Sequence, residues 1–232
     1  YFRGVKLTQK KVIVWGGRSK ARIIVEMIKE IYSDQIEIIG IFDNTLTELS
    51  FNNKIKLYNK KSDLNTLCER ATHFVVCIGG ENGLARFKIA EKLKDRGLLP
   101  LNIISNHAIL DQIDKFGDGI QVMPGAVVNK FSKIGDQCIL NTNSTLDHES
   151  IIGDGVHIMG GASIAGRVQI GNFSIVGTNA TILPDLVIGK NVYIGAGAVV
   201  TKNIIDNVVV VGAPAKTIKK IKQTLDLSIF DN

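Results

Sequence analysis

The chain has 232 residues, 45% of them hydrophobic, and a formal net charge of +6. This apolar share is enough for one or two packed domains and excludes a largely disordered chain, and no apolar run is long enough to cross a membrane. A positive net charge can indicate a nucleic-acid partner, but the lysines are scattered and no aromatic residues interleave with them. We therefore expect neither a nucleic acid nor a membrane as a partner.

The three cysteines, Cys68, Cys77 and Cys138, form an odd and widely spaced set. Cys77 lies in an apolar run and Cys138 at an inward position of the repeat described below, so we interpret both as buried apolar residues and not as disulfide partners. No secretory signal pattern opens the chain. Together these features predict a cytoplasmic protein.

In the first hundred residues, apolar runs that end in glycine or polar turns alternate with helical periodicity. The predicted strands occupy residues 11–17, 36–42, 74–78 and 101–104, and the predicted helices residues 20–31 and 84–96. Residues 45–61 carry little pattern and are expected to form a loop with a short strand. Strand–helix alternation of this kind predicts a Rossmann-like parallel α/β domain over residues 1–104, with a crevice where the strands end.

A glycine turn closes the first predicted strand at Gly16 and Gly17, and Ser19 is expected to cap the helix that follows. Such a turn leaves backbone N–H groups that can receive a phosphate or a carboxylate. Because the full glycine fingerprint of dinucleotide sites is missing, NAD is not predicted.

From Val122 to Val200 an aliphatic residue recurs at every sixth position, and a small or aliphatic residue follows each one four positions later. Neither a helix nor an ordinary alternating strand has this period. It is typical of a solenoid of short parallel strands whose aliphatic side chains fill the interior. Glycine directly after the aliphatic residue, as at Gly135 and Gly171, is expected to let the backbone bend at corners. The sequence therefore predicts a parallel β-helix of hexapeptide repeats over residues 105–232, with imperfect repeats at 105–119.

The six-residue period breaks at Asp206. Residues 208–211 are predicted to form one more strand, a turn follows at 212–216, and a short basic helix at 217–225 is expected to cover the open end of the solenoid. This segment contains a group of four lysines, Lys216, Lys219, Lys220 and Lys222. We interpret them as the solvated face of that helix; a site for a polyanionic small molecule, such as a nucleotide or coenzyme A, is the alternative.

Two of the four histidines, His148 and His157, fall in the regular hexads of the solenoid. Asp147 and Glu149 flank His148, and a carboxylate that reaches one imidazole nitrogen fixes the tautomer and raises the basicity of the ring. A solvated surface histidine beside chance acids is equally compatible with the composition. If three hexads make one turn, Gly166 lies directly above His148, where its backbone N–H can serve as an oxyanion donor beside a general base.

No serine or cysteine nucleophile accompanies His148, so the pattern favours direct acyl transfer over an acyl-enzyme. Some hexapeptide solenoids are zinc carbonic anhydrases that use three histidines. A zinc site needs at least three protein ligands. With two histidines in the solenoid, no metal is expected.

The chain resembles bacterial sugar acetyltransferases that join an N-terminal nucleotide-binding-like domain to a C-terminal left-handed β-helix. The resemblance covers about residues 11–216, and its most specific parts are NTNSTLDHE at 141–149, IGD at 152–154 and VHI at 156–158. The nucleotide-linked amino-sugar N-acetyltransferases are the most similar members, and the sialic acid O-acetyltransferases have a similar layout.

The resemblance implies roles for several residues. The implied catalytic residues are His148 as general base, Glu149 as its assistant, Asn141, and Gly166 as oxyanion donor. The implied coenzyme A contacts are His157 near the acetyl group, Gly166, and the turn residues Gly212, Ala213, Pro214 and Lys216. The implied nucleotide-sugar contacts are Gly16, Gly17, Ser19, Lys20, Asp43, Asn44, Gly79 and Asn82. Lys20 stands where the family usually has histidine, and a lysine can meet a phosphate as a point charge.

Family members are trimers that hold acetyl-CoA between adjacent β-helices, so a homotrimer is expected. The resemblance implies transfer of acetyl from acetyl-CoA to the amine of a nucleotide-linked 4-amino-4,6-dideoxy sugar in bacterial surface glycan biosynthesis. An O-acetyltransferase acting on sialic acid or a related sugar is the alternative, although a free sugar acid would not need the nucleotide pocket. A non-catalytic trimer that binds a sugar nucleotide is the second alternative.

Overall fold

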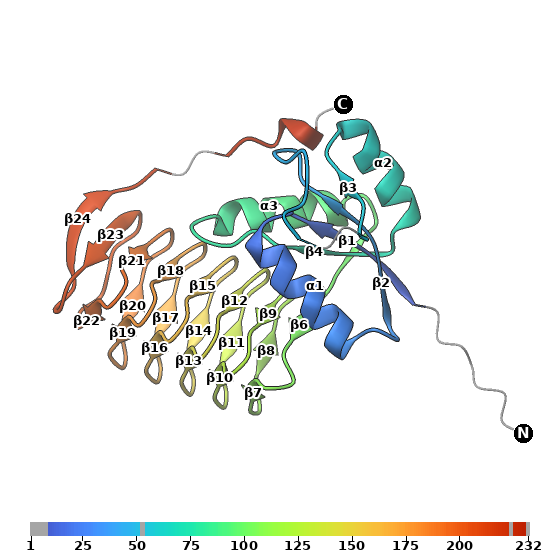
Figure 1. Ribbon diagram of the computed structural model, residues 1–232. Coiled ribbons are helices and arrows are strands. Elements are labelled where there is room, and N and C mark those ends of the chain that lie inside the picture. The colour runs from blue at the N-terminus through green and yellow to red at the C-terminus, as the bar shows by residue number, and fades with distance from the viewer. Residues whose placement is uncertain (1–8, 52–53, 223–224, 231–232) are drawn as a thin grey trace, which may run out of the picture. The chain divides into compact units, whose positions relative to one another are not determined.

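The computed structural model describes residues 9–51, 54–222 and 225–230 and divides the chain into two compact units (Figure 1). The first unit comprises the chain up to Cys77, then Glu91–Leu101 and the segment from Leu227 onward. The second comprises Ile78–Ala90 and Asn102–Asp226. The single boundary expected after residue 104 does not anticipate that residues 78–90 belong with the solenoid.

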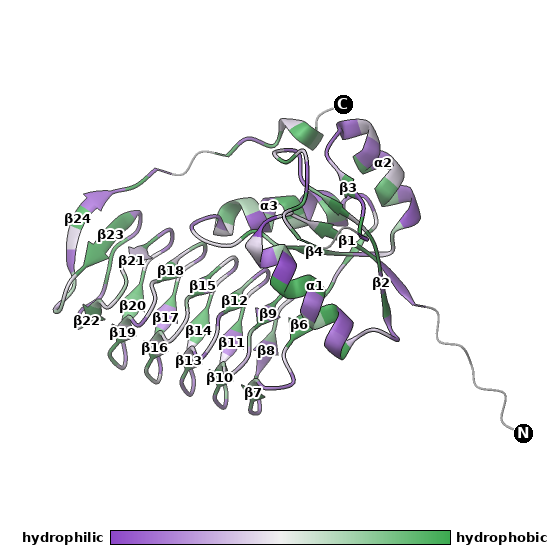
Figure 2. Ribbon diagram, in the orientation of Figure 1, coloured by the Kyte–Doolittle hydropathy of each residue, from purple (hydrophilic) through white to green (hydrophobic). Residues whose placement is uncertain are grey.

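A five-stranded parallel sheet forms the first unit. Its order is β3-β2-β1-β4-β5, and the strands are β1 Lys10–Trp15, β2 Ile36–Phe42, β3 Leu57–Tyr58, β4 His73–Val76 and β5 Leu99–Pro100. The helices among the described residues are α1 Ser19–Ile31, α2 Lys61–Arg70, α3 Gly83–Lys94 and the 3-10 helix η1 Ser228–Phe230, and α3 includes residues of both units. Hydrophobic and hydrophilic residues mix along α1 (Figure 2), and its buried residues include Ile24 and Ile28. The first unit therefore confirms the predicted parallel α/β architecture.

Two local predictions for this unit were wrong, and one helix was not predicted. Ser19 does not cap α1: it is the first helical residue, and the cap residue, Arg18, makes no side-chain capping bond. The single strand expected at 101–104 is replaced by two short strands: β5 of this sheet ends at Pro100, and β6, which belongs to the solenoid, begins at Ile103. Helix α2 was not predicted, because Leu64 and Leu67 are its only buried residues and its apolar pattern is correspondingly weak.

The solenoid of the second unit carries short strands on three faces, and all of them but the last, Lys216–Lys220, run parallel to their neighbours (Figure 1). The first face holds β6 Ile103–Ile104, β9 Gln121–Val122, β12 Ile139–Leu140, β15 His157–Ile158, β18 Ile175–Val176, β21 Tyr193–Ile194, β23 Val208–Val211 and β24 Lys216–Lys220. The second face holds β7 Ile109–Leu110, β10 Val127–Val128, β13 Thr145–Leu146, β16 Ser163–Ile164, β19 Thr181–Ile182 and β22 Val199–Val200. The third face holds β8 Lys115–Phe116, β11 Lys133–Ile134, β14 Ile151–Ile152, β17 Gln169–Ile170 and β20 Val187–Ile188.

Three hexads make one turn of this coil, as predicted. Thr145 pairs with Ser163 and Leu146 with Ile164, and both steps span eighteen residues. In the two-residue strands the second residue packs into the interior, as Leu146 and Ile158 do, which are fully buried. Each such side chain contributes roughly 1.5–3 kcal/mol through the removal of apolar surface from water. Stacked aliphatic side chains therefore form the core of the solenoid.

The corners of the coil bend at a position other than the one predicted. A residue with positive φ recurs every six positions, among them Asn143, Glu149 and Gly155 at +55°, +59° and +65°. Glycine directly after the aliphatic residue meets a different requirement. A Cβ on Gly135 would lie 2.6 Å from the backbone carbon of Gly153 in the next coil. Glycine is needed there because successive coils approach closely.

The prediction of a C-terminal helix at 217–225 was wrong for residues 217–220, which belong to a strand. Lys216–Lys220 form β24, which pairs antiparallel with β23 and contributes the last strand of the first face. Val209 lies opposite Lys219 in this pair. Residues 223 and 224 lie outside the described part of the chain. Strand β24 covers the open edge of the solenoid, as the predicted helix was expected to do, because its backbone pairs with the N–H and C=O groups at the edge of β23.

Candidate active site

His148 occupies the corner between the second and third faces, between β13 and β14. The Asp147 carboxylate holds this corner: its Oδ1 accepts hydrogen bonds from the His148 backbone N–H at 2.7 Å and from Asn129 Nδ2 at 2.8 Å. The Asn129 amide, followed by the His148 N–H, lowers the pKa of Asp147. Asn129 was not predicted as part of the site, although it precedes Asp147 by eighteen residues and counting back one coil finds it.

The imidazole of His148 is hydrogen-bonded to its neighbour along the chain. Nδ1 lies 2.9 Å from Glu149 Oε2, and the two side chains are 43% and 53% exposed. A carboxylate accepts hydrogen bonds, so Nδ1 carries the proton, and Nε2 presents its lone pair when the ring is neutral. Arg167, one coil above Glu149, pairs instead with Asp185 at 2.6 and 2.8 Å, and this pairing lowers the pKa of Asp185. Glu149 is therefore left to the imidazole.

Gly166, one coil after His148, lies against the imidazole of His148. A Cβ on Gly166 would stand 2.5 Å from His148 Nε2, so the ring occupies the space that any side chain there would need. The backbone N–H of His148 donates to the side chain of the preceding residue, Asp147. Gly166 occupies the same position one coil later, but the residue before it is Ala165, whose side chain has no acceptor. Within the described residues, the Gly166 N–H has no hydrogen-bond partner. The structure thus brings a basic nitrogen, its carboxylate and an open backbone donor together at one corner.

Asn141 and His157 are not at this corner. Asn141 lies in the corner between the first and second faces, where its Oδ1 accepts the Thr142 N–H at 3.0 Å. His157 is on the first face, 3% exposed, with Nδ1 3.3 Å from the Gly80 carbonyl oxygen. In a three-sided coil, the corner between two faces lies opposite the third face. His148 and His157 of one chain therefore lie on opposite sides of the solenoid.

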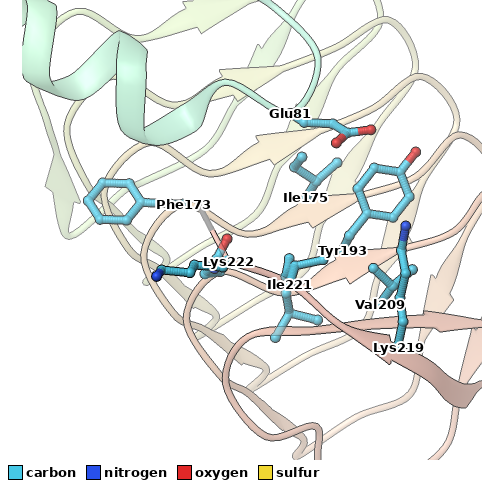
Figure 3. A pocket seen from close by; sticks show the side chains of 10 residues that line it. Glu81, Phe173, Ile175, Tyr193, Val209, Lys219, Ile221 and Lys222 are labelled. Carbon is cyan, nitrogen blue, oxygen red and sulfur yellow. The ribbon is translucent and has the colours of Figure 1, made fainter. Parts of the chain in front are cut away.

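A cavity of about 370 Å³ lies farther along the first face. Its lining consists of Glu81, Phe173, Ile175, Asn191, Val192, Tyr193, Val209, Lys219, Ile221 and Lys222. Figure 3 shows Lys219 beside Tyr193, with the Glu81 carboxylate at the rim. Of the four lysines that were expected on a solvated helix face, Lys219 and Lys222 line this cavity together with several apolar side chains. The predicted turn residues Gly212, Ala213 and Pro214 are exposed between β23 and β24, and Lys216 begins β24.

In the first unit, the glycine turn after β1 is tied to Asp43. Gly16 has φ +97°, and the Gly17 N–H donates to Asp43 Oδ2 at 2.8 Å. The other carboxylate oxygen of Asp43 accepts from Thr45 N and Oγ1 at 2.9 and 2.6 Å. Asp43 therefore shapes the turn with both oxygens. Asn44 is exposed beside it.

The remaining nucleotide-sugar candidates lie at two helix starts. Ser19 and Lys20 begin α1. In the second unit, Asn82 Nδ2 donates to the Gly79 carbonyl at 3.0 Å, just before α3. Both places provide helix N-terminal N–H groups, which suit an anionic ligand.

Burial raises the pKa of the Cys77 and Cys138 thiols to about 12, and no disulfide joins the three cysteines. Among the described residues, no three histidine, cysteine, aspartate or glutamate side chains gather as metal ligands would. No described helix has the length and apolar character needed to cross a bilayer.

Comparisons with known proteins agree with this geometry. A family model described as bacterial transferase hexapeptide (six repeats) matches residues 149–184 and 169–202. The acetyltransferase domain of PglB from Neisseria gonorrhoeae FA1090 is 27% identical with TM-score 0.79, over 90% of this chain and 100% of that chain. PerB from Caulobacter crescentus, in complex with CoA and GDP-perosamine, is 27% identical with TM-score 0.78, over 90% and 97%. WeeI from Acinetobacter baumannii AYE is 28% identical with TM-score 0.76, over 89% and 99%.

No curated protein sequence matches the chain. The structural matches confirm the predicted fold class, an α/β unit followed by a left-handed β-helix of hexapeptide repeats, and the predicted resemblance to sugar N-acetyltransferases. The PglB domain has also been solved in complex with acetyl coenzyme A. The fold and the structural neighbours are thus those of acetyl-CoA-dependent sugar N-acetyltransferases.

Proposed function

We propose that this protein transfers acetyl from acetyl-CoA to the amine of a nucleotide-linked 4-amino-4,6-dideoxy sugar, in the cytoplasm, for bacterial surface glycan biosynthesis. The observation that carries the proposal is the His148 imidazole, bonded to Glu149 through Nδ1 and lying with Nε2 against Gly166. The match over nearly the whole chain to PerB, which was solved with CoA and GDP-perosamine, supports the substrate class.

The proposed reaction is a direct transfer. The uncharged amine attacks the thioester carbonyl carbon while Nε2 of His148 accepts a proton from the nitrogen. Glu149 stabilises the imidazolium that forms, and the Gly166 N–H donates to the oxyanion of the tetrahedral intermediate. The intermediate collapses as its C–S bond breaks, and the imidazolium returns the proton to the departing thiolate of coenzyme A. The products are an amide and a free thiol.

The opposite placement of His148 and His157 supports a site shared between two chains. An acetyl group near the His148 corner of one chain cannot also reach the first face of that chain. It can reach the first face of a neighbouring chain, where His157 lies. A closed ring of three chains repeats this contact three times and gives the homotrimer that we propose.

The cavity on the first face is the proposed site of the coenzyme A moiety. His157, Ile175, Tyr193 and Val209 follow one another across successive strands, and Lys219 lies opposite Val209. Four strand spacings of about 4.8 Å make this row roughly 19 Å long. An acyl-pantetheine arm laid along it has its thioester near His157, its chain on the apolar wall, and its phosphates toward Lys219 and Lys222. The turn residues Gly212, Ala213, Pro214 and Lys216 lie at the same end.

Replacing Lys219 and Lys222 together by alanine is expected to raise the KM for acetyl-CoA by about tenfold for each lysine, because each lost charge–phosphate contact is worth roughly 1.5 kcal/mol. The KM for the nucleotide sugar should change little. Lys115→Ala/Lys133→Ala is the matched control, since it removes two exposed lysines from the third face. Equal KM values for acetyl-CoA in the two double variants would remove the cavity from the cofactor site.

The nucleotide sugar is proposed to bind the glycine turn at Gly16 and Gly17, whose shape Asp43 fixes. Ser19 and Lys20 at the start of α1 suit its phosphates, and Asn44 lies exposed beside the turn. In the second unit, Gly79 and Asn82 are the proposed contacts. Lys20 supplies the positive charge where related enzymes usually have histidine.

Thiol release from acetyl-CoA tests the proposal against a panel of UDP-, dTDP- and GDP-linked 4-amino sugars. Each amino sugar is paired with its 4-hydroxy counterpart, and free sialic acid completes the panel. We expect release with at least one amino sugar and not with its hydroxy counterpart. Release with sialic acid alone would establish an O-acetyltransferase. Binding of a sugar nucleotide without release from any member would establish a non-catalytic trimer.

A further inference from the structure

Arg86, in the first turn of α3, is a buried charge that the proposed reaction does not use. Its side chain is fully buried. Nε donates to the Gln137 carbonyl at 2.7 Å, Nη1 to the Ile78 carbonyl at 2.9 Å and Nη2 to the Gly155 carbonyl at 2.8 Å. All of these residues belong to the second unit. The guanidinium thus bonds three backbone carbonyls at once.

No acidic side chain balances this charge among the described residues. Burial lowers the pKa of Arg86 to about 10, so the guanidinium stays protonated at neutral pH. The nearby Cys138 thiol stays neutral, because its own burial raises its pKa to about 12. A buried charge without a counter-ion is stable only when dipoles replace its water. Here the three carbonyl oxygens do so.

The carbonyls that Arg86 bonds are spaced by the coil. Gln137 and Gly155 are eighteen residues apart and occupy the same left-handed position in successive coils, at the corner between the third and first faces. A planar guanidinium presents parallel N–H groups to such stacked carbonyls, which the single ammonium of lysine does not. The third bond, to Ile78, ties the beginning of the same segment to this corner.

Other contacts press residues 78–90 onto the same corner. A Cβ on Gly83 would lie 2.3 Å from the Gly155 carbonyl oxygen, so the two backbones are in direct contact. The rings of Phe87 and Phe173 pack with centroids 5.6 Å apart. Arg86 therefore lies at the centre of a contact that builds residues 78–90 into the solenoid.

The loop held in this way carries two groups of the proposed site. The Gly80 carbonyl lies at Nδ1 of His157, and because a carbonyl only accepts, Nδ1 of His157 carries the proton. Gly79 and Asn82, bonded to each other, are the proposed nucleotide-sugar contacts of this loop. If the loop moves, both the imidazole tautomer and these contacts change.

We propose that Arg86 is a positioning residue: it fixes loop 79–82 on the solenoid, and thereby sets the tautomer of His157 and the place of the nucleotide-sugar contacts Gly79 and Asn82. The role in substrate binding rests on the proposed function, whereas the role in holding the loop and His157 does not. The loop is accordingly a permanent part of the β-helix unit and does not become ordered only on substrate binding.

Two measurements on the unsubstituted protein test the loop directly. The backbone amides of residues 79–82 are expected to show ¹⁵N order parameters close to those of the neighbouring coils, about 0.85. With imidazole ¹⁵N labelling, four histidines give a spectrum simple enough to assign, and His157 is expected to show a single tautomer protonated at Nδ1. Order parameters below about 0.6 in this loop would overturn the proposal.

Substitution then isolates Arg86. In Arg86→Met the His157 signals should become those of a mixed tautomer, and the Kd for the nucleotide sugar should rise about tenfold, while the Kd for CoA changes less. Arg86→Lys should lie between, and millimolar guanidinium added to Arg86→Ala should restore the native signals. Lys92→Met, an exposed change on the same helix, is the control.

A folded Arg86→Met protein with an unchanged His157 spectrum and unchanged nucleotide-sugar affinity would overturn the proposal. If Arg86→Met does not fold, Arg86→Lys and the addition of guanidinium to Arg86→Ala provide the same test: an unchanged His157 spectrum and unchanged nucleotide-sugar affinity in Arg86→Lys, or no restoration by guanidinium, would overturn the proposal. If no sugar binds the unsubstituted protein, the proposed function fails, while the His157 tautomer still reports on Arg86.

Discussion

Replacing His148 by alanine is expected to lower kcat for acetyl transfer by about 100- to 10,000-fold, the range that a general base contributes. The KM values should change little, because the ring contacts the reacting atoms and not the nucleotide or the bulk of coenzyme A. The side chain is 43% exposed, so the substitution leaves no cavity in the core and the melting temperature should stay close to that of the unsubstituted protein. Steady-state thiol release at saturating acetyl-CoA measures the effect.

His107→Ala is the matched control, because His107 is an exposed histidine of the same unit whose described hydrogen bonds involve only its backbone. Glu149→Gln should lie between the control and His148→Ala, since the amide still bonds Nδ1 but no longer stabilises the imidazolium by charge. Near-normal turnover in His148→Ala would remove this residue from the chemistry.

Replacing Gly166 by alanine is expected to lower kcat by about 100-fold or more, because it displaces the general base, whose contribution is about 100- to 10,000-fold. The physical reason is steric: the new Cβ would stand 2.5 Å from His148 Nε2, and the imidazole must move off the donor. Gly160→Ala is the matched control, because the nearest atom to its new Cβ, the Thr142 carbonyl oxygen, lies 3.4 Å away. Both variants are assayed for thiol release and thermal stability.

The double variant His148→Ala/Gly166→Ala tests the steric reason. With the imidazole removed, the methyl group has nothing to displace, so the second substitution should cost much less than it does alone. Full additivity of the two losses would show that Gly166 acts independently of the ring position.

Much of the β-helix was predictable because one physical requirement repeats along it. Each strand needs one inward aliphatic residue, so a missed step would leave a void, and the six-residue period is unbroken from Val122 to Val200. Counting three hexads to a turn then placed Gly166 over His148. The same counting finds Asn129 beneath Asp147.

Other features depend on contacts between segments that the period does not relate. The sequence does not distinguish Arg86 from the other basic residues of α3, and its burial follows from stacked carbonyls of a corner far along the chain. Strand β24 follows from pairing with β23, since its five residues carry no alternation that distinguishes a strand from a helix. The placement of Asn141 and His157 away from His148 follows from the three faces of the coil, which a motif read along the chain does not reveal.

Mixed trimers test most directly whether the reacting acetyl group lies between the His148 corner of one chain and the first face of another. His148→Ala chains and Lys219→Ala/Lys222→Ala chains are co-expressed with different tags, and trimers containing both are purified. They are assayed at acetyl-CoA concentrations at which each parent trimer is nearly inactive. A shared site predicts thiol release well above the sum of the two parents, because some interfaces pair an intact His148 with an intact cavity. Release no greater than that sum would place both halves of the site within one chain and contradict the proposed arrangement.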